Sequence, residues 1–389
     1  MKTREVKLGE VANVKGGKRI PKGIGLINIP NGHPYIRVRD LNNKRLLELD
    51  NSYEYVDNET QKVISKYTVK TGDVVLSIVG TIGLVAIVGR TLDGANLTEN
   101  CVKLSSFHGV NRDFLYYYLR SDCGQQEIRC GTVGAVQAKL PIKNIQNIAI
   151  NLPDYTTQER IASLLLSIDR KIELNQKIND NLQQQAMALY AEMFLNSSNN
   201  DVTSGTLSDI AVITMGQSPS GSSYNEDGVG EVFYQGRAEF GFRFPKRRLF
   251  TTEPKRMAVA GDVLLSVRAP VGDLNMAYER CCIGRGLGAI HSKTGHSSFV
   301  LYTMFALRSQ LNVFNGEGTV FGSINRDALN AIPIDVPLVT KIDQFEAVAH
   351  PIDELIRTNY EENCRLEAIR NSLLPKLMSG EIDVSAIRL

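Results

Sequence analysis

Side chains suited to nucleic-acid recognition lie in three short polar clusters, and each cluster occurs once in either half of the chain. The clusters of the first and second half are 16–23 and 216–224, then 35–41 and 233–248, then 134–139 and 322–326. Arginine can bind guanine through two hydrogen bonds, and glutamine or asparagine can do the same for adenine. Lysine, serine and backbone N–H groups bind phosphates. A solvated loop is the simplest interpretation of any one cluster, but equivalent placement in both halves favours recognition.

Two sets of DNA-contacting side chains follow from these clusters and from the segment SVRAP at 266–270. For base contacts we predict Arg37, Arg39, Gln137, Gln235, Arg237 and Asn325. For phosphate contacts we predict Lys18, Arg19, Lys22, Lys139, Ser218 and Arg268. The side chains differ between the halves while the flanking β-like segments agree. Two modules that read different sequences from one scaffold would require this pattern.

Motifs for catalysis are missing from the sequence. It contains no P-loop, no GxSxG and no HExxH. It also lacks the N/D-P-P-Y/F tetrapeptide that an amino-methyltransferase needs to hold its target amine. His291 and His296 have a poor spacing for a metal site and are interpreted as surface residues, and Glu253 and Lys255 flank a proline in what we interpret as a loop. We therefore predict no catalytic residue, no metal site and no cofactor.

The composition is that of an ordinary globular chain with a basic first part. The 389 residues are 43% hydrophobic and 22% charged. Residues 1–153 carry 21 Lys and Arg against 14 Asp and Glu, a net charge of +7, which is weak support for a polyanionic partner. No apolar run reaches the ~18 residues of a membrane span. The six cysteines show no pairing pattern, so we expect reduced thiols, a cytoplasmic location and no membrane partner.

The chain repeats one plan twice. TGDVVLSIVGTIG at 71–83 returns as AGDVLLSVRAPVG at 260–272, and further short matches keep their order at offsets of 184 to 199. The polar segment 196–205 has the composition of a linker. Each half combines a β-rich region, broken by glycine, asparagine and aspartate, with one long helical pattern at its end. This organisation predicts an α+β fold with two pseudo-repeated β-rich domains, each followed by a long helix.

A sustained heptad pattern marks both long helices. The residues expected to pair the helices are Ile168, Ile172, Asn175, Asn179 and Leu182 in the first and Ile352, Ile356, Asn359, Asn363 and Leu366 in the second. The first helix should begin after Pro153, with Thr156 and Glu159 as a capping box. An apolar seam exposed to water would be marginal, so the two helices are expected to pair as an antiparallel coiled coil.

Prolines in the second helix and asparagines in both seams are the unusual features. Pro351 should break the helix near His350, and Pro375 should kink or end it, which leaves a helix over 352–378. In a paired seam the asparagines would face one another, where mutual hydrogen bonds offset the cost of burying amides and fix the register. The alternative is a rotated seam whose asparagines face solvent.

These segments, in this order and duplicated, resemble the specificity (S) subunits of type I restriction–modification systems. The resemblance covers the whole chain and rests on the openings LGEVA and LSDIA, the GDVVLS and GDVLLS runs, the segment TTQERIASLLLSIDRKIELNQ and the tail SLLPKLMSGEID. It implies two target recognition domains that read the halves of a split DNA site, and two long helices that set their spacing. It also implies a non-catalytic subunit that binds two adenine-N6 methyltransferase subunits and, through them, motor–nuclease subunits.

The resemblance divides the chain into four segments. These are recognition domain 1 (1–153), long helix 1 with the linker (154–200), recognition domain 2 (201–338) and long helix 2 with the C-terminal tail (339–389). Leu164 and Leu166 lie off the pairing stripe and are expected to contact the methyltransferase. The second half departs from the family pattern at Pro351, and its recognition domain is not net basic.

Two other functions stay open on the sequence. One is a stand-alone nuclease or methyltransferase, which the missing motifs disfavour. The other is a coiled-coil scaffold whose β domains bind protein rather than DNA. A steep salt dependence of DNA binding by the assembled complex would separate recognition from scaffolding, because it reports phosphate contacts.

Overall fold

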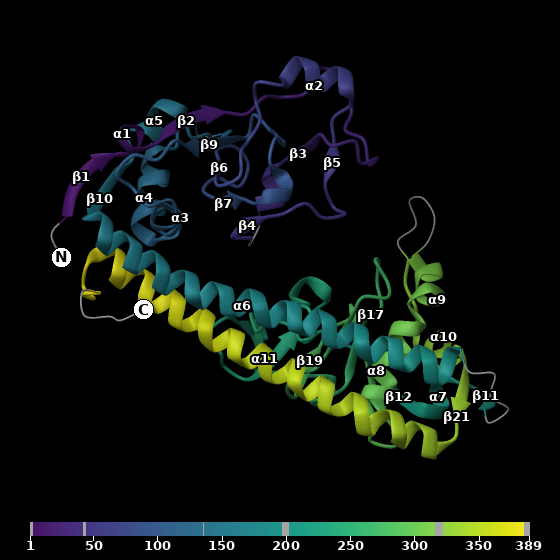
Figure 1. The fold of residues 1–389 in the computed structure, drawn as a ribbon. Helices are drawn as coiled ribbons and strands as arrows, with labels where there is room; N and C mark the ends of the chain where they lie inside the picture. The colour runs from purple at the N-terminus through teal and green to yellow at the C-terminus, as the bar shows by residue number, and fades with distance from the viewer. Residues whose placement is uncertain (1–2, 42–43, 135, 197–201, 316–321, 385–389) are drawn as a thin grey trace. The chain divides into compact units, whose positions relative to one another are not determined.

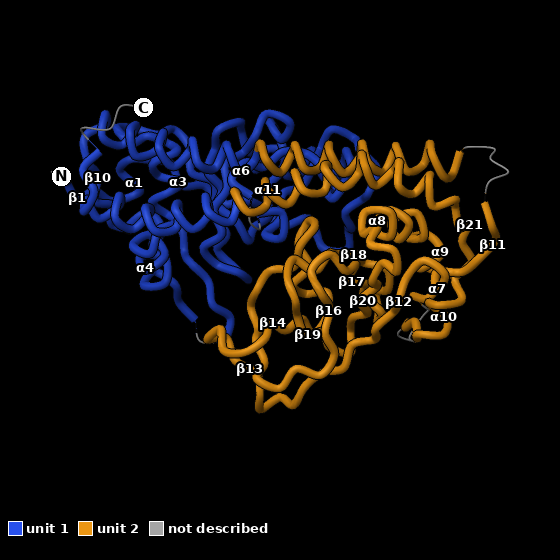
Figure 2. Tube along the Cα trace, turned by 90° about the horizontal axis from the view of Figure 1, so that it is seen from below, with its two compact units in different colours: residues 1–173, 363–389 blue, residues 174–362 orange. Residues whose placement is uncertain are grey.

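The computed structural model describes residues 3–41, 44–134, 136–196, 202–315 and 322–384 (Figure 1). The chain forms two units, drawn in blue and orange in Figure 2. Unit 1 consists of 1–173 and 363–389, and unit 2 consists of 174–362. Both boundaries fall inside long helices, so each unit combines a β-rich region with one segment of either helix. The architecture is α+β, as the sequence predicts.

Unit 1 is built on a five-stranded sheet in the order β2-β9-β6-β7-β4 and a three-stranded sheet in the order β5-β3-β8. Its strands are β1 (Thr3–Lys7), β2 (Asn13–Gly16), β3 (Pro34–Ile36), β4 (Leu46–Leu47), β5 (Glu54–Tyr55), β6 (Val74–Ser77), β7 (Val85–Val88), β8 (Asn96–Leu97), β9 (Cys101–Ser105) and β10 (Ala149–Pro153). Its shorter helices are α1 (Leu8–Val11), η1 (Val38–Leu41), α2 (Asn58–Ile64), η2 (Arg90–Leu92), α3 (Arg112–Arg120), α4 (Asp122–Gly131) and α5 (Ile142–Gln146). Phe114, Leu115 and Tyr116 of α3 share one core with the central strands β6 and β9.

Unit 2 is built on a four-stranded sheet in the order β12-β20-β17-β18 and a five-stranded sheet in the order β13-β15-β14-β19-β16. Its strands are β11 (Val202–Thr206), β12 (Ala211–Met215), β13 (Tyr224–Asn225), β14 (Glu231–Tyr234), β15 (Phe250–Thr251), β16 (Met257–Ala258), β17 (Val263–Ser266), β18 (Leu274–Met276), β19 (Cys281–Ile283), β20 (Leu287–Ser292) and β21 (Pro333–Pro337). Its shorter helices are η3 (Ala191–Leu195, a π-helical turn), α7 (Leu207–Ile210), η4 (Gly221–Ser223), η5 (Arg237–Glu239), α8 (Ser297–Ala306), α9 (Arg308–Asn312), η6 (Val313–Asn315) and α10 (Arg326–Asn330). Phe299, Val300 and Leu301 of α8 share one core with β17 and β20.

The strand pairings of the two units correspond. β1 pairs antiparallel with β10, and β11 does the same with β21. The order β2-β9-β6-β7 matches β12-β20-β17-β18, and the parallel pair β3–β8 matches β14–β19. The repeated GDVVLS and GDVLLS runs form β6 and β17. Ser77 and Ser266 at their ends each bridge the following tight turn, donating one hydrogen bond to a carbonyl and accepting one from an amide.

The first long helix, α6 (Tyr155–Tyr190), starts with a different cap from the predicted one. Asp154, rather than Thr156 with Glu159, is the capping residue. It accepts hydrogen bonds from the Thr157 hydroxyl at 2.6 Å and from the Thr157 N–H at 3.0 Å, and these bonds lower the Asp154 pKa. An aspartate directly before the first turn satisfies a helix N–H group without a capping box.

The second long helix, α11 (Val339–Ser379), is continuous. The predicted break at Pro351 is therefore wrong, and Pro375 does not end the helix. Pro351 and the residue four positions before it are exposed, so the carbonyl that loses its N–H partner lies on the solvent side. Phe345 and Ile356 on the flanking turns are fully buried. Burying such side chains contributes about 1.5–3 kcal/mol each, which offsets the ~3 kcal/mol that an interior proline costs.

The predicted seam is covered rather than exposed on both long helices. Ile168, Ile172, Asn175, Asn179, Ile356, Asn359 and Asn363 are buried, and Leu182, Ile352 and Leu366 are half-buried. In unit 2, Asn359 donates a 2.8 Å hydrogen bond to the side-chain oxygen of Asn179, which itself donates to the Ile356 carbonyl at 3.3 Å. Asn175 donates to Glu362 at 2.7 Å. These amides join α6 to α11 within unit 2 and do not face solvent.

Candidate nucleic-acid interface

A five-residue turn at 97–101, called turn 1 below, organises the predicted DNA-contacting residues of unit 1. Its first and last carbonyls accept hydrogen bonds from the N–H groups of Lys18 at 2.8 Å and Gly17 at 3.0 Å. The N–H of its second residue donates to the Ile36 carbonyl at 3.0 Å, and the carbonyl of its fourth residue accepts from the Ile78 N–H at 2.8 Å. The first two polar clusters and the hairpin after β6 thus meet at one turn.

The first cluster approaches turn 1 so closely that a glycine is needed. A Cβ on Gly17 would lie 2.1 Å from a carbonyl oxygen of the turn. Lys18 and Lys22, which follow, are exposed. The Arg19 side chain is 81% exposed, and its Nε lies 2.9 Å from Glu99 Oε1. The close contact therefore delivers three basic side chains to the surface beside turn 1.

Arg37 and Arg39 leave the end of β3 and share one carboxylate. Both form ion pairs with Glu54, at 2.6 Å for Arg39. Asp40 holds the same segment, since it accepts from the Arg37 N–H at 2.7 Å and lies 3.3 Å from the Arg39 Nε. Burial lowers the pKa of Arg37. The two guanidinium groups are thus held side by side, with part of their charge offset.

The third cluster of unit 1 forms a hairpin. Val133 and Lys139 exchange two backbone hydrogen bonds of 2.9 Å. The N–H that follows Lys139 donates to the Ile78 carbonyl at 2.9 Å, which places the hairpin beside the strand end that reaches turn 1. Gln137 is exposed in the hairpin loop. Ala135 of this cluster lies outside the described residues.

Unit 2 has the same arrangement around a turn at 283–287, called turn 2 below. Its first and last carbonyls accept from the N–H groups of Gln217 and Gly216, both at 2.9 Å. The N–H of its second residue donates to the Tyr234 carbonyl at 2.8 Å, and the carbonyl of its fourth residue accepts from the Val267 N–H at 3.0 Å. A Cβ on Gly216 would lie 2.1 Å from a carbonyl oxygen of the turn, as at the equivalent glycine of unit 1.

Three predicted residues of unit 2 lie beside turn 2. Gln235 directly follows β14 and is exposed. It occupies the position that Arg37 has after β3 in unit 1. Arg237 is exposed and forms an ion pair with Asp273. The Ser218 hydroxyl accepts from the Arg285 N–H at 3.2 Å. The two units thus carry different polar groups at equivalent positions.

Asn325 occupies a different place from the one that its sequence match to Gln137 suggests. Backbone bridges pair Arg268 with Ser323 in unit 2 and Val79 with Lys139 in unit 1. Ser323 therefore corresponds to Lys139, and Asn325 to the residue two positions beyond. The Asn325 side-chain oxygen accepts at 2.9 Å from an N–H in the first turn of α10. A carboxamide engaged in this way does not present both of its groups to adenine.

Sequence reasoning missed the central residues of the two turns, Glu99 and Arg285. Each is the third residue of its turn, and Arg285 is exposed. A Cβ on Gly284 or Gly286 would lie 2.9 Å or less from the Gln235 backbone. The sequence carried a signal, because glycines on both sides of an arginine are typical of a turn that packs tightly against another backbone.

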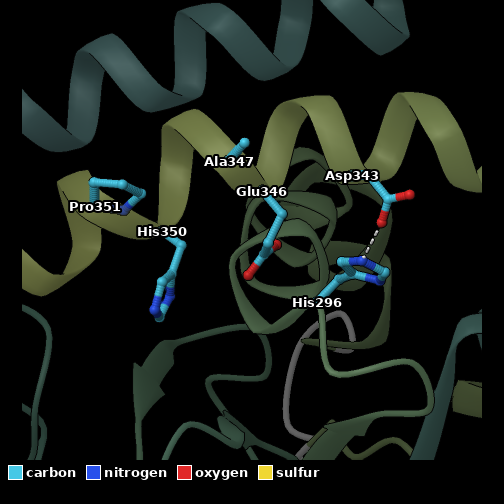
Figure 3. Close-up of a pocket in the computed structure, with 6 residues that line it drawn as sticks. All are labelled: His296, Asp343, Glu346, Ala347, His350 and Pro351. Carbon is cyan, nitrogen blue, oxygen red and sulfur yellow. Dashed lines mark hydrogen bonds and ion pairs between the residues drawn. The ribbon is translucent and has the colours of Figure 1, made fainter.

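A separate cavity of unit 2, of about 350 Å³, lies between the start of α8 and α11 (Figure 3). His296 Nε2 lies 2.8 Å from Asp343 Oδ1, while Glu346 accepts from two N–H groups in the first turn of α8 at 3.0 and 3.2 Å. The His296 side chain is 16% exposed, so it is half-buried at the rim of this cavity. Among the described residues, no group of three or more His, Cys, Asp or Glu side chains is placed to hold a metal ion.

Comparison with known proteins assigns the first part of the chain to a family and finds relatives over nearly its whole length. Residues 2–184 match the type I restriction modification DNA specificity domain. A protein of Methanocaldococcus jannaschii described as the MjaX type I restriction enzyme specificity subunit is 28% identical over 382 residues, covering 91% of this chain and 88% of that protein. Residues 2–184 thus carry a type I restriction modification DNA specificity domain, and the chain as a whole is similar to type I restriction enzyme specificity subunits.

Two further similarities also extend over most of the chain. The type I restriction enzyme HindI specificity subunit of Haemophilus influenzae is 23% identical over 339 residues, covering 66% of this chain and 73% of that protein. The crystal structure of the type I restriction–modification system S subunit from M. genitalium shares the fold, with a TM-score of 0.57 at 16% identity, covering 97% of this chain and 96% of that one. In the described part of the chain, no helix is both long and apolar enough to cross a membrane.

Proposed function

We propose that this specificity subunit is the non-catalytic DNA-reading component of a type I restriction–modification complex, with two recognition domains that each read one half of a split site. The observation that carries the proposal is the duplicated turn. Turns 1 and 2 make equivalent backbone hydrogen bonds but present Glu99 and Arg285, and the segment beside them presents Arg37 in one unit and Gln235 in the other. One scaffold with different polar side chains is suited to two different base sequences.

The side chains proposed to contact DNA lie on the segments bonded to the two turns. They are Lys18, Arg19, Lys22, Arg37, Arg39, Gln137 and Lys139 in the first recognition domain and Ser218, Gln235, Arg237, Arg268 and Arg285 in the second. Asn325 is left out because its side chain caps α10. Ion pairs with Glu54 and Asp273 orient three of the arginines before DNA arrives.

We further infer that the two long helices pair as an antiparallel coiled coil and set the spacer between the half-sites. The corresponding segments are recognition domain 1 (1–153), helix 1 with the linker (154–200), recognition domain 2 (201–338) and helix 2 with the tail (339–389). Within unit 2, Asn175 bonds Glu362 and Asn179 bonds Asn359. Residue numbers therefore rise along α6 while those of the partners fall along α11, which is the order of an antiparallel pair. Buried amides that bond one another support a fixed register.

An exchange of segment 201–338 tests the proposed function. The segment would be replaced by its equivalent from a family member that recognises another site, and methylation of a genome carrying the system would be mapped. We expect a hybrid site, in which one half and the spacer stay as before and the other half changes. An unchanged site, or a change in both halves, contradicts the modular assignment. Weak, salt-independent DNA binding by the assembled complex would favour the protein-binding scaffold instead.

We propose that two methyltransferase subunits bind along the long helices and that motor–nuclease subunits join the complex through them. Val348 and Leu355 of α11 support this, because they are 51% and 46% exposed and one heptad apart, on one face. Val348 is the counterpart in the sequence repeat of Leu164, for which this contact was predicted. Leu164 packs partly against the core of unit 1 and Leu166 is half-buried, so changes there would also disturb folding.

The double variant V348D/L355D is expected to weaken assembly with the methyltransferase. Central contacts of an interface cost more than about 1 kcal/mol each when truncated, so losing two of them should lower the affinity by about 30-fold or more. Gel filtration and titration calorimetry with the purified methyltransferase measure the change. V63D, which places the same charge at the 68% exposed Val63 of α2, is the matched control and should leave assembly intact. Wild-type assembly by V348D/L355D would remove this face from the proposal.

A further inference from the structure

Three lysines and a tyrosine of unit 1 line one pocket next to turn 1. A cavity of about 260 Å³ is lined by Lys15, Lys66, Lys103 and Tyr67, together with the first residue of turn 1. Lys18 Nζ lies 5.7 Å from the centroid of the Tyr67 ring. This site, the lysine pocket, therefore adjoins the segment that carries the first cluster of predicted DNA-contacting residues.

The lysine pocket places like charges against each other. Lys15 and Lys103 are directly opposite in the antiparallel pair β2–β9, so their side chains stand on one face, an arrangement that destabilises a sheet. Lys103 has compensation, because its Nζ lies 3.1 Å from Asp73 and donates to the Thr68 carbonyl at 2.7 Å. Within the described part of the chain, Lys15 and Lys66 take part in no ion pair. Three lysines thus line the pocket and a fourth lies over its tyrosine, and among the described residues only one of the four is paired with an aspartate.

The sheet itself does not require two facing lysines. In unit 2 the equivalent strands β12 and β20 place Thr214 opposite Ala289 at the same register. Gln217 takes the place of Lys18, since its N–H makes the equivalent bond to turn 2. The same sheet therefore forms with neutral residues. Unit 2 avoids the repulsion that Lys15 and Lys103 cause in unit 1. Since the sheet does not need this repulsion, the lysines indicate a ligand of opposite charge.

We propose that the lysine pocket binds a backbone phosphate of the DNA half-site whose bases lie at turn 1. This inference rests on the proposed function. Lysine binds phosphate as a compact point charge, and phosphate contacts fix the position of a protein on its duplex. Lys18 lies over the tyrosine of the pocket, and the first residue of turn 1 lines the pocket. Both also belong to the segments that carry the proposed DNA contacts of unit 1. A phosphate held here would set the position of the bases relative to Arg37 and Gln137.

The variant K15T tests the proposal, because it introduces the residue that unit 2 has at the same register. The full subunit, assembled with its methyltransferase partners, would be titrated with labelled duplex between 50 and 200 mM salt. Each phosphate contact contributes a slope of about −0.9 to the dependence of log affinity on log salt. K15T should lose one contact. Its affinity should therefore fall roughly 3.5-fold less than that of the wild type between 50 and 200 mM salt. The change should be equal for specific and non-specific duplexes, and the thermal stability of the subunit should not decrease.

Two controls separate this inference from its alternatives. K62T removes a lysine that is 71% exposed and paired with Glu59 on α2, and it should keep the wild-type slope. A wild-type slope for K15T overturns the phosphate assignment. A second outcome also overturns it. If inorganic phosphate stabilises the wild type but not K15T, while both proteins show the same salt slope for DNA binding, the pocket is a site for a free anion. If the wild-type complex itself shows no salt-dependent binding, the proposed function fails together with this inference.

Discussion

Replacing Arg285 by alanine is expected to lower the affinity of the assembled complex for its recognised site by about 5- to 150-fold. This range corresponds to the 1–3 kcal/mol by which one bidentate arginine–guanine contact discriminates against the wrong base. The loss should appear at one base pair, in the half-site assigned to unit 2. The half-site assigned to unit 1 should be read as before.

The geometry of turn 2 is the reason for this expectation. Gly284 and Gly286 let the turn pack against the backbone of Gln235, and Arg285 projects from between them. Its N–H is held by the Ser218 hydroxyl at 3.2 Å. Arg237 is engaged by Asp273, whereas Arg285 has no ion pair within the residues that the structure describes. Its exposed guanidinium is therefore available to a ligand beside turn 2.

Duplexes with every single-base change in the unit 2 half-site provide the measurement. The wild type should discriminate at the position that Arg285 reads, and R285A should bind all four base pairs there with similar affinity. R280A is the matched control, because Arg280 is 65% exposed in the same unit and lies 3.8 Å from Glu231, away from turn 2. A uniform loss on all duplexes, including non-specific ones, would assign Arg285 to a phosphate instead.

Turn 1 carries the opposite charge at the same position. Glu99 can accept a hydrogen bond from the amino group of cytosine. The Arg19 Nε lies 2.9 Å from Glu99 Oε1, so this ion pair would have to open or rotate when the carboxylate meets a base. The two half-sites are thus expected to differ at corresponding positions, although the backbone that presents both residues is the same.

Features that repeat along the chain could be predicted from the sequence. The heptad pattern located both helices, because a buried stripe imposes a period on the residues that cover it. The duplicated GDVVLS and GDVLLS runs located β6 and β17, since their buried strands and terminal serines form the same local structure twice. The placement of Arg37 and Gln235 at equivalent points also followed, because each directly ends a short buried strand.

Features that depend on distant contacts could not be predicted in this way. Pro351 should break a helix by its local chemistry, yet packing of the neighbouring turns overrides it. The sequence predicts Asn325 as a base-contacting residue. The backbone bridge between Arg268 and Ser323 instead aligns Ser323 with Lys139, so Asn325 does not correspond to Gln137. Arg243 lies in the second cluster of the second half, as Arg247 does, and the sequence does not predict an ion pair with Asp353. Only the fold reveals that Arg243 is buried.

Replacing Arg243 by methionine is expected to destabilise unit 2 by about 3–5 kcal/mol, because it leaves a buried carboxylate without its counter-charge. The side chains of Arg243 and Asp353 are 2% and 8% exposed, and Nη1 lies 2.6 Å from Oδ1. Arg243 Nη2 also donates to Gln183 at 3.1 Å. Burial raises the pKa of Tyr302, so its hydroxyl stays protonated and donates to Asp353 at 2.9 Å.

Denaturant unfolding of the full subunit measures the loss, and R247M is the matched control. Arg247 also pairs with a carboxylate, that of Glu279, but it is 55% exposed. Exposed pairs contribute about 0.2–1 kcal/mol, so R247M should unfold close to the wild type. The double variant R243M/D353L should recover most of the stability, since a buried ion pair can be replaced by apolar side chains. Equal destabilisation by R243M and R247M would contradict the buried-pair account.

The same variants separate stability from DNA reading. Arg243 lies in the segment that follows Gln235 and Arg237, and its partner Asp353 belongs to α11, so the pair ties the proposed reading segment of unit 2 to the long helix. Below the unfolding transition, R243M should lose discrimination in the unit 2 half-site only. If R243M/D353L regains stability but not discrimination, the ion pair contributes orientation that apolar packing cannot supply. If R243M/D353L regains both stability and discrimination, apolar packing is enough to position the segment. Each charge of the pair is then needed only to neutralise the other.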